Sequence, residues 1–285
     1  MAATITPAND RGATMQFGIV GIPTVREADG LIDRAITFAR RVERLGFSGL
    51  WTTDALGRGF VTVDPLIFLS TLCVATERIE IGTCVTQVPL RHPVELAHRA
   101  QTLNILSRGR FRFGVGSGST KHDFDTVQVD YDRRFKLLPE YLAVMRRVWA
   151  GEKVFGPALS VWPGTEGGPP VYLGAWRSQR WIDLAAHHCH GWIASGIHGA
   201  MEDLPIGLDM FRKAGGKRAI LANIFTDLRP DPPHIPAHAK VTVTGGKAEA
   251  RDRLRRIADL GFDDALLIVP MGAPDMLDEI RDLLP

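Results

Sequence analysis

Residues 16–54 read QFGIVGIPTVREADGLIDRAITFARRVERLGFSGLWTTD, and their pattern indicates a strand–helix–strand unit. Its two apolar runs, QFGIVGI (16–22) and GLWTTD (49–54), predict strands that are buried on both faces. The segment 31–45 between them carries apolar residues at helical spacing, and Gly46 follows as a helix stop. No G-x-G-x-x-G follows the first strand, so this strand–helix–strand unit lacks the dinucleotide-binding fingerprint.

The same alternation continues toward the C-terminus. Eight strands, each followed by a helix, in 285 residues predict a single (β/α)8 TIM barrel. A doubly wound open sheet is the alternative, but the count of eight and the missing fingerprint favour the barrel. The remaining strands are predicted at 78–88, 110–118, 171–176, 191–196, 219–228 and 265–271. The remaining helices are predicted at 65–75, 94–107, 134–150, 178–188, 247–260 and 275–284, and a weaker one at 201–214 is broken by Leu204-Pro205.

The domain organisation follows from this alternation. Residues 1–14 are predicted to be a flexible N-terminal extension, and residues 15–285 to be one barrel domain. The longest interval between strands, about 119–170, is interpreted as an insertion between the fourth and fifth strands. It holds one amphipathic helix and a Gly/Pro-rich stretch.

Composition limits the classes of partner. The net charge is +2, from 34 basic and 32 acidic residues, and no basic run stands out, so we expect no nucleic acid partner. No apolar stretch reaches the length of a membrane span, and the N-terminus lacks the features of a signal peptide. The three cysteines have no C-x-x-C spacing, and the run His187-His188-Cys189-His190 projects in diverging directions. We therefore expect a cytoplasmic protein without disulfides or a metal site.

In TIM barrels the active site lies at the carboxyl ends of the strands. Here those ends are rich in Gly, Ser and Thr and poor in paired carboxylates, which argues against a glycosidase. Backbone N–H groups and hydroxyls instead suit a phosphate and a flat ring. The tip GVGSGS (114–119) is either an anion nest or a tight turn. At the next tip Ser178 is a helix cap that, with Arg177, could also face a phosphate. The pair Arg133-Arg134, which opens the helix of the insertion, is either a phosphate clamp or a solvated pair.

Four segments in order carry a family resemblance. The span from about residue 16 to residue 284 resembles the luciferase-like flavin-dependent oxidoreductases, the superfamily of bacterial luciferase and related monooxygenases. Its WTTD tip and RHP turn are most similar to an uncharacterised luciferase-type oxidoreductase branch. The four segments are IGTCVTQVPLRHPVELA (81–97), LSRGRFRFGVGSGS (106–119), VDYDRRFKLLPEYLAVMRRVWAGEKV (129–154) and VYLGAWRSQRWIDLAAHHCHGWIASG (171–196).

The resemblance implies a barrel that binds FMN, or its deazaflavin analogue, at the mouth. It also implies a cis peptide bond between Cys84 and Val85 that backs the isoalloxazine ring. Thr53 and Asp54 match a position near the polar edge of the flavin or the substrate. The positions that match the cofactor and phosphate site are Gly116, Ser117, Gly118, Ser119, Arg134, Gly174, Ala175, Arg177 and Ser178.

This sequence departs from the family pattern at one position that matters for proton transfer. Bacterial luciferase and several deazaflavin relatives have a histidine directly after the acidic residue, whereas this chain has Ala55. Light emission is therefore not expected, and a general acid or base must come from elsewhere. Asp54 and His198 are the catalytic candidates, and His122 is a further candidate by location alone.

The function implied by the resemblance is an FMN-dependent monooxygenase that uses reduced FMN and oxygen on a small organic substrate. The alternatives are a deazaflavin-dependent hydride transferase, which a more basic mouth would favour and which Lys121, Arg134 and Arg177 leave open, and a flavin-binding protein without turnover. The expected partners are a separate flavin reductase and a second copy of this chain, in a homodimer or a higher homo-oligomer. Phe60, Trp162 and Trp176 are apolar candidates for the substrate pocket.

Overall fold

The computed structural model describes residues 14–22, 30–59, 62–159, 166–229 and 235–285. Nearly all of the predicted N-terminal extension lies outside these residues, as do Phe60 and Trp162.

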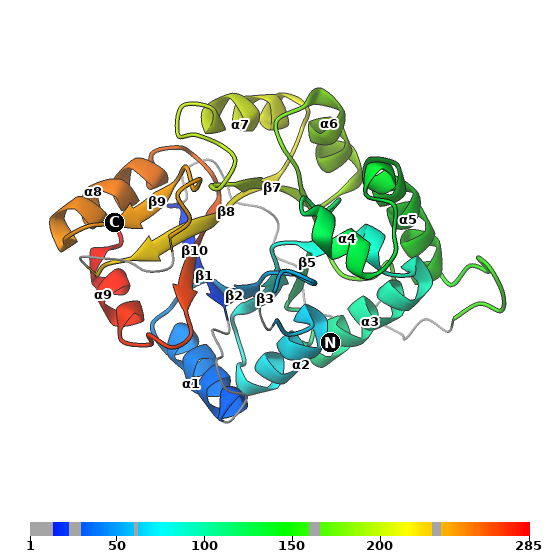
Figure 1. Ribbon diagram of the computed structural model, residues 1–285, viewed down its shortest axis with the longest axis horizontal. Helices are drawn as coiled ribbons and strands as arrows, with labels where there is room; N and C mark the ends of the chain where they lie inside the picture. The colour runs from blue at the N-terminus through cyan, green and yellow to red at the C-terminus, as the bar shows by residue number, and fades with distance from the viewer. Residues whose placement is uncertain (1–13, 23–29, 60–61, 160–165, 230–234) are drawn as a thin grey trace.

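Among the described residues, eight parallel strands close a TIM barrel, as the alternation predicts (Figure 1). The order is β1, β2, β3, β5, β6, β7, β8 and β10, and β10 closes the ring because it pairs with both β8 and β1. A short β4 (Thr86–Gln87) pairs with the end of β5, and β9 (Thr242–Thr244) extends the sheet from β8. The barrel strands are β1 (Gln16–Ile22), β2 (Gly49–Thr52), β3 (Glu80–Thr83), β5 (Phe111–Gly116), β6 (Val171–Gly174), β7 (Gly191–Ser195), β8 (Arg218–Asp227) and β10 (Asp264–Pro270).

Helices surround the barrel in a ring (Figure 1). Sequence punctuation sets their ends: Gly46, with φ of 77°, follows α1, and the Asp64 carboxylate accepts hydrogen bonds from two N–H groups in the first turn of α2. The α-helices are α1 (Leu31–Arg44), α2 (Pro65–Ala75), α3 (Pro93–Leu106), α4 (Lys121–Thr126), α5 (Arg134–Trp149), α6 (Gln179–His188), α7 (Leu204–Lys213), α8 (Lys247–Ala258) and α9 (Met276–Leu283), and two 3₁₀ turns are η1 (Val88–Leu90) and η2 (Tyr131–Arg133).

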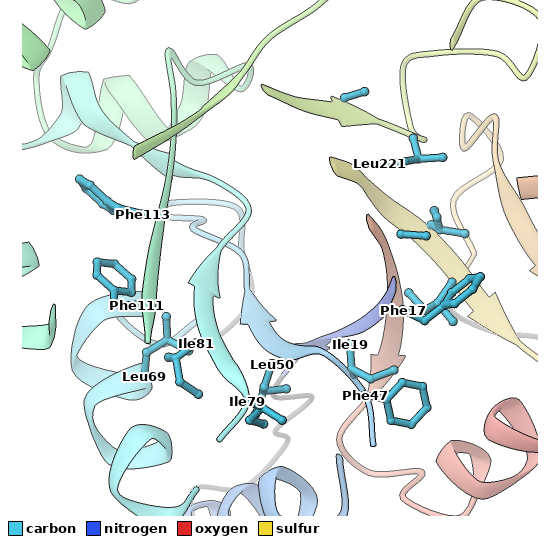
Figure 2. Close-up of a cluster of buried hydrophobic side chains, with 14 of the residues drawn as sticks. Phe17, Ile19, Phe47, Leu50, Leu69, Ile79, Ile81, Phe111, Phe113 and Leu221 are labelled. Carbon is cyan, nitrogen blue, oxygen red and sulfur yellow. The ribbon is translucent and has the colours of Figure 1, made fainter. Parts of the chain in front are cut away.

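Both faces of the strands are buried, which explains their continuous apolar runs. One set of side chains packs between the barrel and the helices, and it includes Ile19, Leu50 and Ile81 of three neighbouring strands (Figure 2). The alternate set fills the barrel interior, where Val20 and Trp51 belong to a separate cluster. Alternate side chains of each strand thus belong to two different cores, one outside and one inside the barrel.

A charged cluster closes the amino-end of the barrel. Arg218, at the start of β8, donates hydrogen bonds to Asp264 at 2.7 and 2.8 Å and to Glu80 at 2.8 and 2.9 Å. Arg112 donates a third hydrogen bond to Glu80 at 2.7 Å. Burial raises the pKa of Asp264 despite its pair with Arg218, whereas for Glu80 the two arginines outweigh burial and lower the pKa. These residues stabilise the end opposite the mouth.

The helix prediction at 201–214 is wrong about Leu204-Pro205, because this dipeptide begins α7 rather than breaking it. Proline is tolerated in a first helical turn, where its missing N–H has no intrahelical partner. Strand β9 and helix α4 were not predicted, since each is very short. Within the long interval that follows β5, helix α5 contacts α3 and belongs to the ring, while α4 and η2 precede it near the mouth.

Candidate active site at the barrel mouth

The tips of β3, β5 and β6 meet around the side chain of Val85. The peptide bond between Cys84 and Val85 is cis, as the resemblance implies. A Cβ atom on Gly116 would lie 2.6 Å from Val85 Cγ2, and one on Gly174 would lie 2.7 Å from Val85 Cγ1. Both positions therefore require glycine for the three tips to approach this closely.

An apolar floor lies at the carboxyl end of the barrel interior. Ile22, Val85 and Phe225 are half-buried and pack on top of the interior cluster. Cys84 is fully buried beneath them, and burial raises the pKa of its thiol to about 12. The thiol is thus protonated and unreactive at neutral pH. The exposed side of this floor suits a flat, apolar ring.

The loop at the tip of β5 contains Ser117, Gly118 and Ser119. Gly118 has φ of 82°, and its close approach to Phe124 leaves no room for a Cβ atom. The hydroxyl of Tyr131 donates to the Ser119 carbonyl oxygen at 3.0 Å, which ties the loop to η2. The left-handed backbone conformation of Gly118 gives the loop the turn that an anion nest requires.

Arg134, at the start of α5, lies on two aromatic rings. Its guanidinium carbon is 3.6 Å from the ring centroid of Tyr131 and 4.1 Å from that of Phe135. One guanidinium N–H bonds to the Tyr131 carbonyl oxygen at 2.9 Å, while the buried Nε atom has no hydrogen-bond partner among the described residues. The structure therefore leaves this cation able to donate to an anion.

The tip of β6 carries Gly174, Ala175, Arg177 and Ser178. Ser178 is the N-cap residue of α6, as predicted, although its hydroxyl makes no capping hydrogen bond. Its exposed hydroxyl and the first N–H groups of α6 are available to a ligand. Arg177 is paired instead with Asp203 at 2.8 Å, on the side of α7.

Asp54 is held in a buried ion pair. Arg91 donates to its two carboxylate oxygens at 2.6 and 3.0 Å, and the backbone N–H of Gln87 donates to Oδ2 at 2.9 Å. Only 6% of Asp54 is exposed, whereas its neighbour Thr53 is half-buried at the mouth. The carboxylate therefore fixes the RHP turn against the tip of β2.

Asp123, in the first turn of α4, is a buried residue that the sequence did not single out. Its carboxylate accepts hydrogen bonds from Arg58 at 2.6 and 3.0 Å, from Gln87 Nε2 at 2.8 Å and from the Leu56 N–H at 3.2 Å. Burial opposes ionisation, but the bonds from Arg58 and Gln87 outweigh it and lower the pKa of Asp123. Asp123 thus joins three strand tips below the mouth.

His198 lies past the end of β7, exposed at the rim. Its ring centroid is 5.1 Å from that of Trp176. Partial burial, and then the nearby His238, lower the pKa of His198 below its usual value, so the imidazole is uncharged at neutral pH. His122 is exposed on α4. Among the residues that the structure describes, no group of three His, Cys, Asp or Glu side chains could hold a metal ion.

These observations fit a flat ligand with a phosphate. The floor around Val85 would face the ring, and the β5 loop, the start of α6 and the guanidinium of Arg134 would face the phosphate. The fold and this mouth define a parallel TIM barrel with a candidate cofactor site at its carboxyl end.

A family comparison covers almost the whole barrel. The sequence profile of the family described as luciferase-like monooxygenase matches residues 15–281, and the chain belongs to this family. An uncharacterised protein of Mycobacterium bovis is 30% identical over 224 residues, which are 75% of this chain and 72% of that protein.

A monooxygenase and a reductase are among the solved structures that share the fold. Monooxygenase RslO1 from Streptomyces bottropensis superimposes with a TM-score of 0.82 and 20% identity, over 95% of this chain and 98% of that one. The coenzyme F420 dependent tetrahydromethanopterin reductase from Methanopyrus kandleri superimposes with a TM-score of 0.73 and 14% identity, over 95% of this chain and 99% of that one. In the described part of the chain, no helix is long and apolar enough to cross a membrane.

Proposed function

We propose that this protein is an FMN-dependent monooxygenase that uses reduced FMN and oxygen on a small organic substrate. The proposal rests on one observation: an apolar floor around Val85 lies beside strand tips whose hydrogen-bond donors could bind a phosphate. Membership of the luciferase-like monooxygenase family supports it. The cofactor, when bound, supplies the redox chemistry that no side chain can supply.

The residues of the chain bind, orient and shield. Val85, Ile22 and Phe225 would support the ring, because they form the half-buried top of the interior cluster. The backbone around Gly118 and the side chain of Arg134 would hold the phosphate. Packing on an apolar floor keeps water from one face of the ring, which favours oxygen transfer over side reactions.

Charge at the mouth favours FMN over the deazaflavin cofactor, whose tail carries more negative charge. Lys121 is paired with Asp125 at 2.5 Å, and Arg177 is paired with Asp203 at 2.8 Å. Of the three cations that leave the deazaflavin open, Arg134 alone has an unsatisfied buried donor among the described residues. One such cation matches one phosphate better than a long anionic tail.

Proton handling is assigned to His198 in this proposal. The Asp54 carboxylate is occupied by Arg91, whereas the His198 imidazole is uncharged and lies at the rim. His198 would therefore hold or release a proton at the substrate's side of the mouth.

The test is a pair of titrations of apo-protein, with FMN and with the deazaflavin. We expect FMN to bind more tightly, and Arg134→Ala to weaken FMN binding by about tenfold or more, equivalent to about 1.4 kcal/mol. Arg133→Ala is the matched control, because Arg133 is the exposed neighbour of Arg134. Tighter binding of the deazaflavin would favour the hydride transferase instead, and no binding of either would refute both.

Supply of reduced FMN is the second part of the proposal. The chain carries no dinucleotide-binding fingerprint after β1, so we propose that a separate reductase delivers the reduced cofactor. Substrate oxygenation should then require NADH, FMN and an added flavin reductase together. Oxygenation with NADH and FMN alone would contradict this part.

A further inference from the structure

A pocket of about 190 Å³ opens beside the candidate cofactor site, between the tips of β6 and β7 and the start of α7. It borders that site at Ala175 and Arg177, which are predicted cofactor residues. Its depth is lined by Trp192, Ala194 and Leu204, all of which are buried. Apart from Ala175 and Arg177, the residues that line this pocket have no part in the assignment of the cofactor.

The size of the pocket limits the ligand. A cavity of about 150 Å³ lined by apolar side chains accepts benzene. A pocket of about 190 Å³ therefore has room for one ring with a small substituent. Two indoles, Trp176 and Trp192, supply aromatic surface for such a ring.

Trp176 is an exposed part of the pocket lining. It is 66% exposed, and its ring contacts His198. Trp192 is fixed instead, because its Nε1–H donates to the Ala175 carbonyl oxygen at 3.0 Å. A ring that enters the pocket would cover apolar surface of Trp176 that is now in water, and this burial would contribute to binding.

The charges at the rim cancel. Arg177 and Asp203 both line the pocket and form an ion pair at 2.8 Å. His198 is uncharged at neutral pH because its pKa is lowered. A charged ligand would lose its hydration without gaining an unpaired counter-charge, so the pocket favours an uncharged molecule.

One hydrogen-bonding position remains inside. The Ser195 hydroxyl oxygen accepts from the Ile197 N–H at 3.3 Å and from Asn223 Nδ2 at 3.4 Å, and its own proton has no acceptor among the described residues. Together with the His198 imidazole it offers a donor and an acceptor to one oxygen of a ligand.

We propose that this pocket binds an uncharged single-ring molecule carrying one hydroxyl or carbonyl oxygen, and that this molecule is the substrate. Its role as substrate rests on the proposed monooxygenase function, whereas the binding itself does not. Trp176 then determines which rings are accepted, and Ser195 and His198 orient the oxygen.

The experiment measures binding of four ring probes to the full-length apo-protein by calorimetry. The probes are phenol, cyclohexanone, benzoate and benzylammonium. We expect millimolar or tighter binding of phenol or cyclohexanone, and binding of both ions that is about tenfold weaker or undetectable. Equal binding of charged and uncharged probes, or no binding of any probe, would overturn the proposal.

Single substitutions test whether the probe binds in this pocket. Trp176→Ala should weaken the uncharged probe at least about fivefold, and Ser195→Ala should weaken it about threefold or more. Ile206→Ala is the control, because Ile206 is an exposed apolar residue of α7 outside the pocket lining. Since Trp176 is exposed, its truncation should leave the melting temperature unchanged. Unchanged affinity in Trp176→Ala and Ser195→Ala would show that the probe binds elsewhere.

A parallel FMN titration separates this proposal from the proposed function. FMN binding without probe binding would refute the pocket alone. Probe binding without binding of FMN or the deazaflavin would keep the pocket and refute its role in an oxygenase.

Discussion

Gln87 Nε2 donates a hydrogen bond to Asp123 Oδ2 across 2.8 Å, and both residues are buried. The backbone N–H of Gln87 donates to Asp54 Oδ2 at 2.9 Å, so one residue of β4 connects two buried carboxylates. Its remaining side-chain oxygen is buried without a hydrogen-bond partner and lies against Gly118. The candidate phosphate loop thus lies directly on a charged, hydrogen-bonded layer.

Removing the charge of Asp123 should destabilise the fold. Asp123→Asn leaves Arg58 without its carboxylate partner, and we expect a loss of about 2–3 kcal/mol in the free energy of unfolding, because one side of this ion pair is fully buried. Urea unfolding measures the loss. Asp125→Asn is the control, because its pair with Lys121 is exposed and should contribute little to stability. Equal effects of the two substitutions would contradict the structural role of Asp123.

The same residue predicts a pH dependence. The pKa of Asp123 is lowered in the folded protein, so its stabilising effect is complete above the unfolded pKa of about 3.9 and is lost as the pH falls through the folded value. Stability of the unchanged protein should therefore fall on acidification below about pH 4. Asp123→Asn should flatten this part of the curve, measured as urea midpoints at several pH values. Parallel curves would mean that another carboxylate dominates acid unfolding.

Asp54→Asn distinguishes structural from catalytic use of this carboxylate. Both oxygens of Asp54 are bonded to Arg91, whose side chain is 16% exposed, so we expect a loss of about 2–4 kcal/mol in stability. For a chain of this size each kcal/mol lowers the melting temperature by about 2–4 °C. Calorimetry checks the shift. Unchanged stability with lost turnover would instead identify Asp54 as a catalytic residue.

The glycines around Val85 predict an effect on cofactor affinity. In Gly116→Ala the new methyl group would lie 2.6 Å from Val85 Cγ2, so Val85 or the β5 tip must move. We expect FMN affinity to fall about tenfold or more, which is about 1.4 kcal/mol. Gly156→Ala is the control, because no heavy atom lies within 4 Å of its new methyl group. Fluorescence titration compares the two, and equal affinities would exclude Val85 from the ring's support.

The sequence predicted the barrel and the cis bond but not the charged layer, for a physical reason. Strands and helices follow from local periodicity, whereas the cis bond between Cys84 and Val85 is implied by the family resemblance of the segment around it. The bond between Arg58 and Asp123 joins residues 65 positions apart. In the sequence, Asp123 is one of two acidic residues in a short helix, and no local pattern distinguishes the buried one from the exposed Asp125. Only the closed barrel brings its partners together.

The outward face of α2 predicts self-association. Ile67 and Val74 are 65% and 72% exposed, and their spacing of seven places them on one side of a helix that is apolar almost all round. Such a helix is normally covered, so we expect a homodimer in which this face is buried. Light scattering coupled to size-exclusion chromatography should give twice the mass of one chain, and one chain for the double variant Ile67→Lys, Val74→Lys. The control Ile206→Lys alters an exposed isoleucine on α7 and should leave the dimer intact. A monomeric unmodified protein would contradict this assignment. A dimer that survives the double substitution would also contradict it, because burying two charges at an apolar contact must weaken that contact.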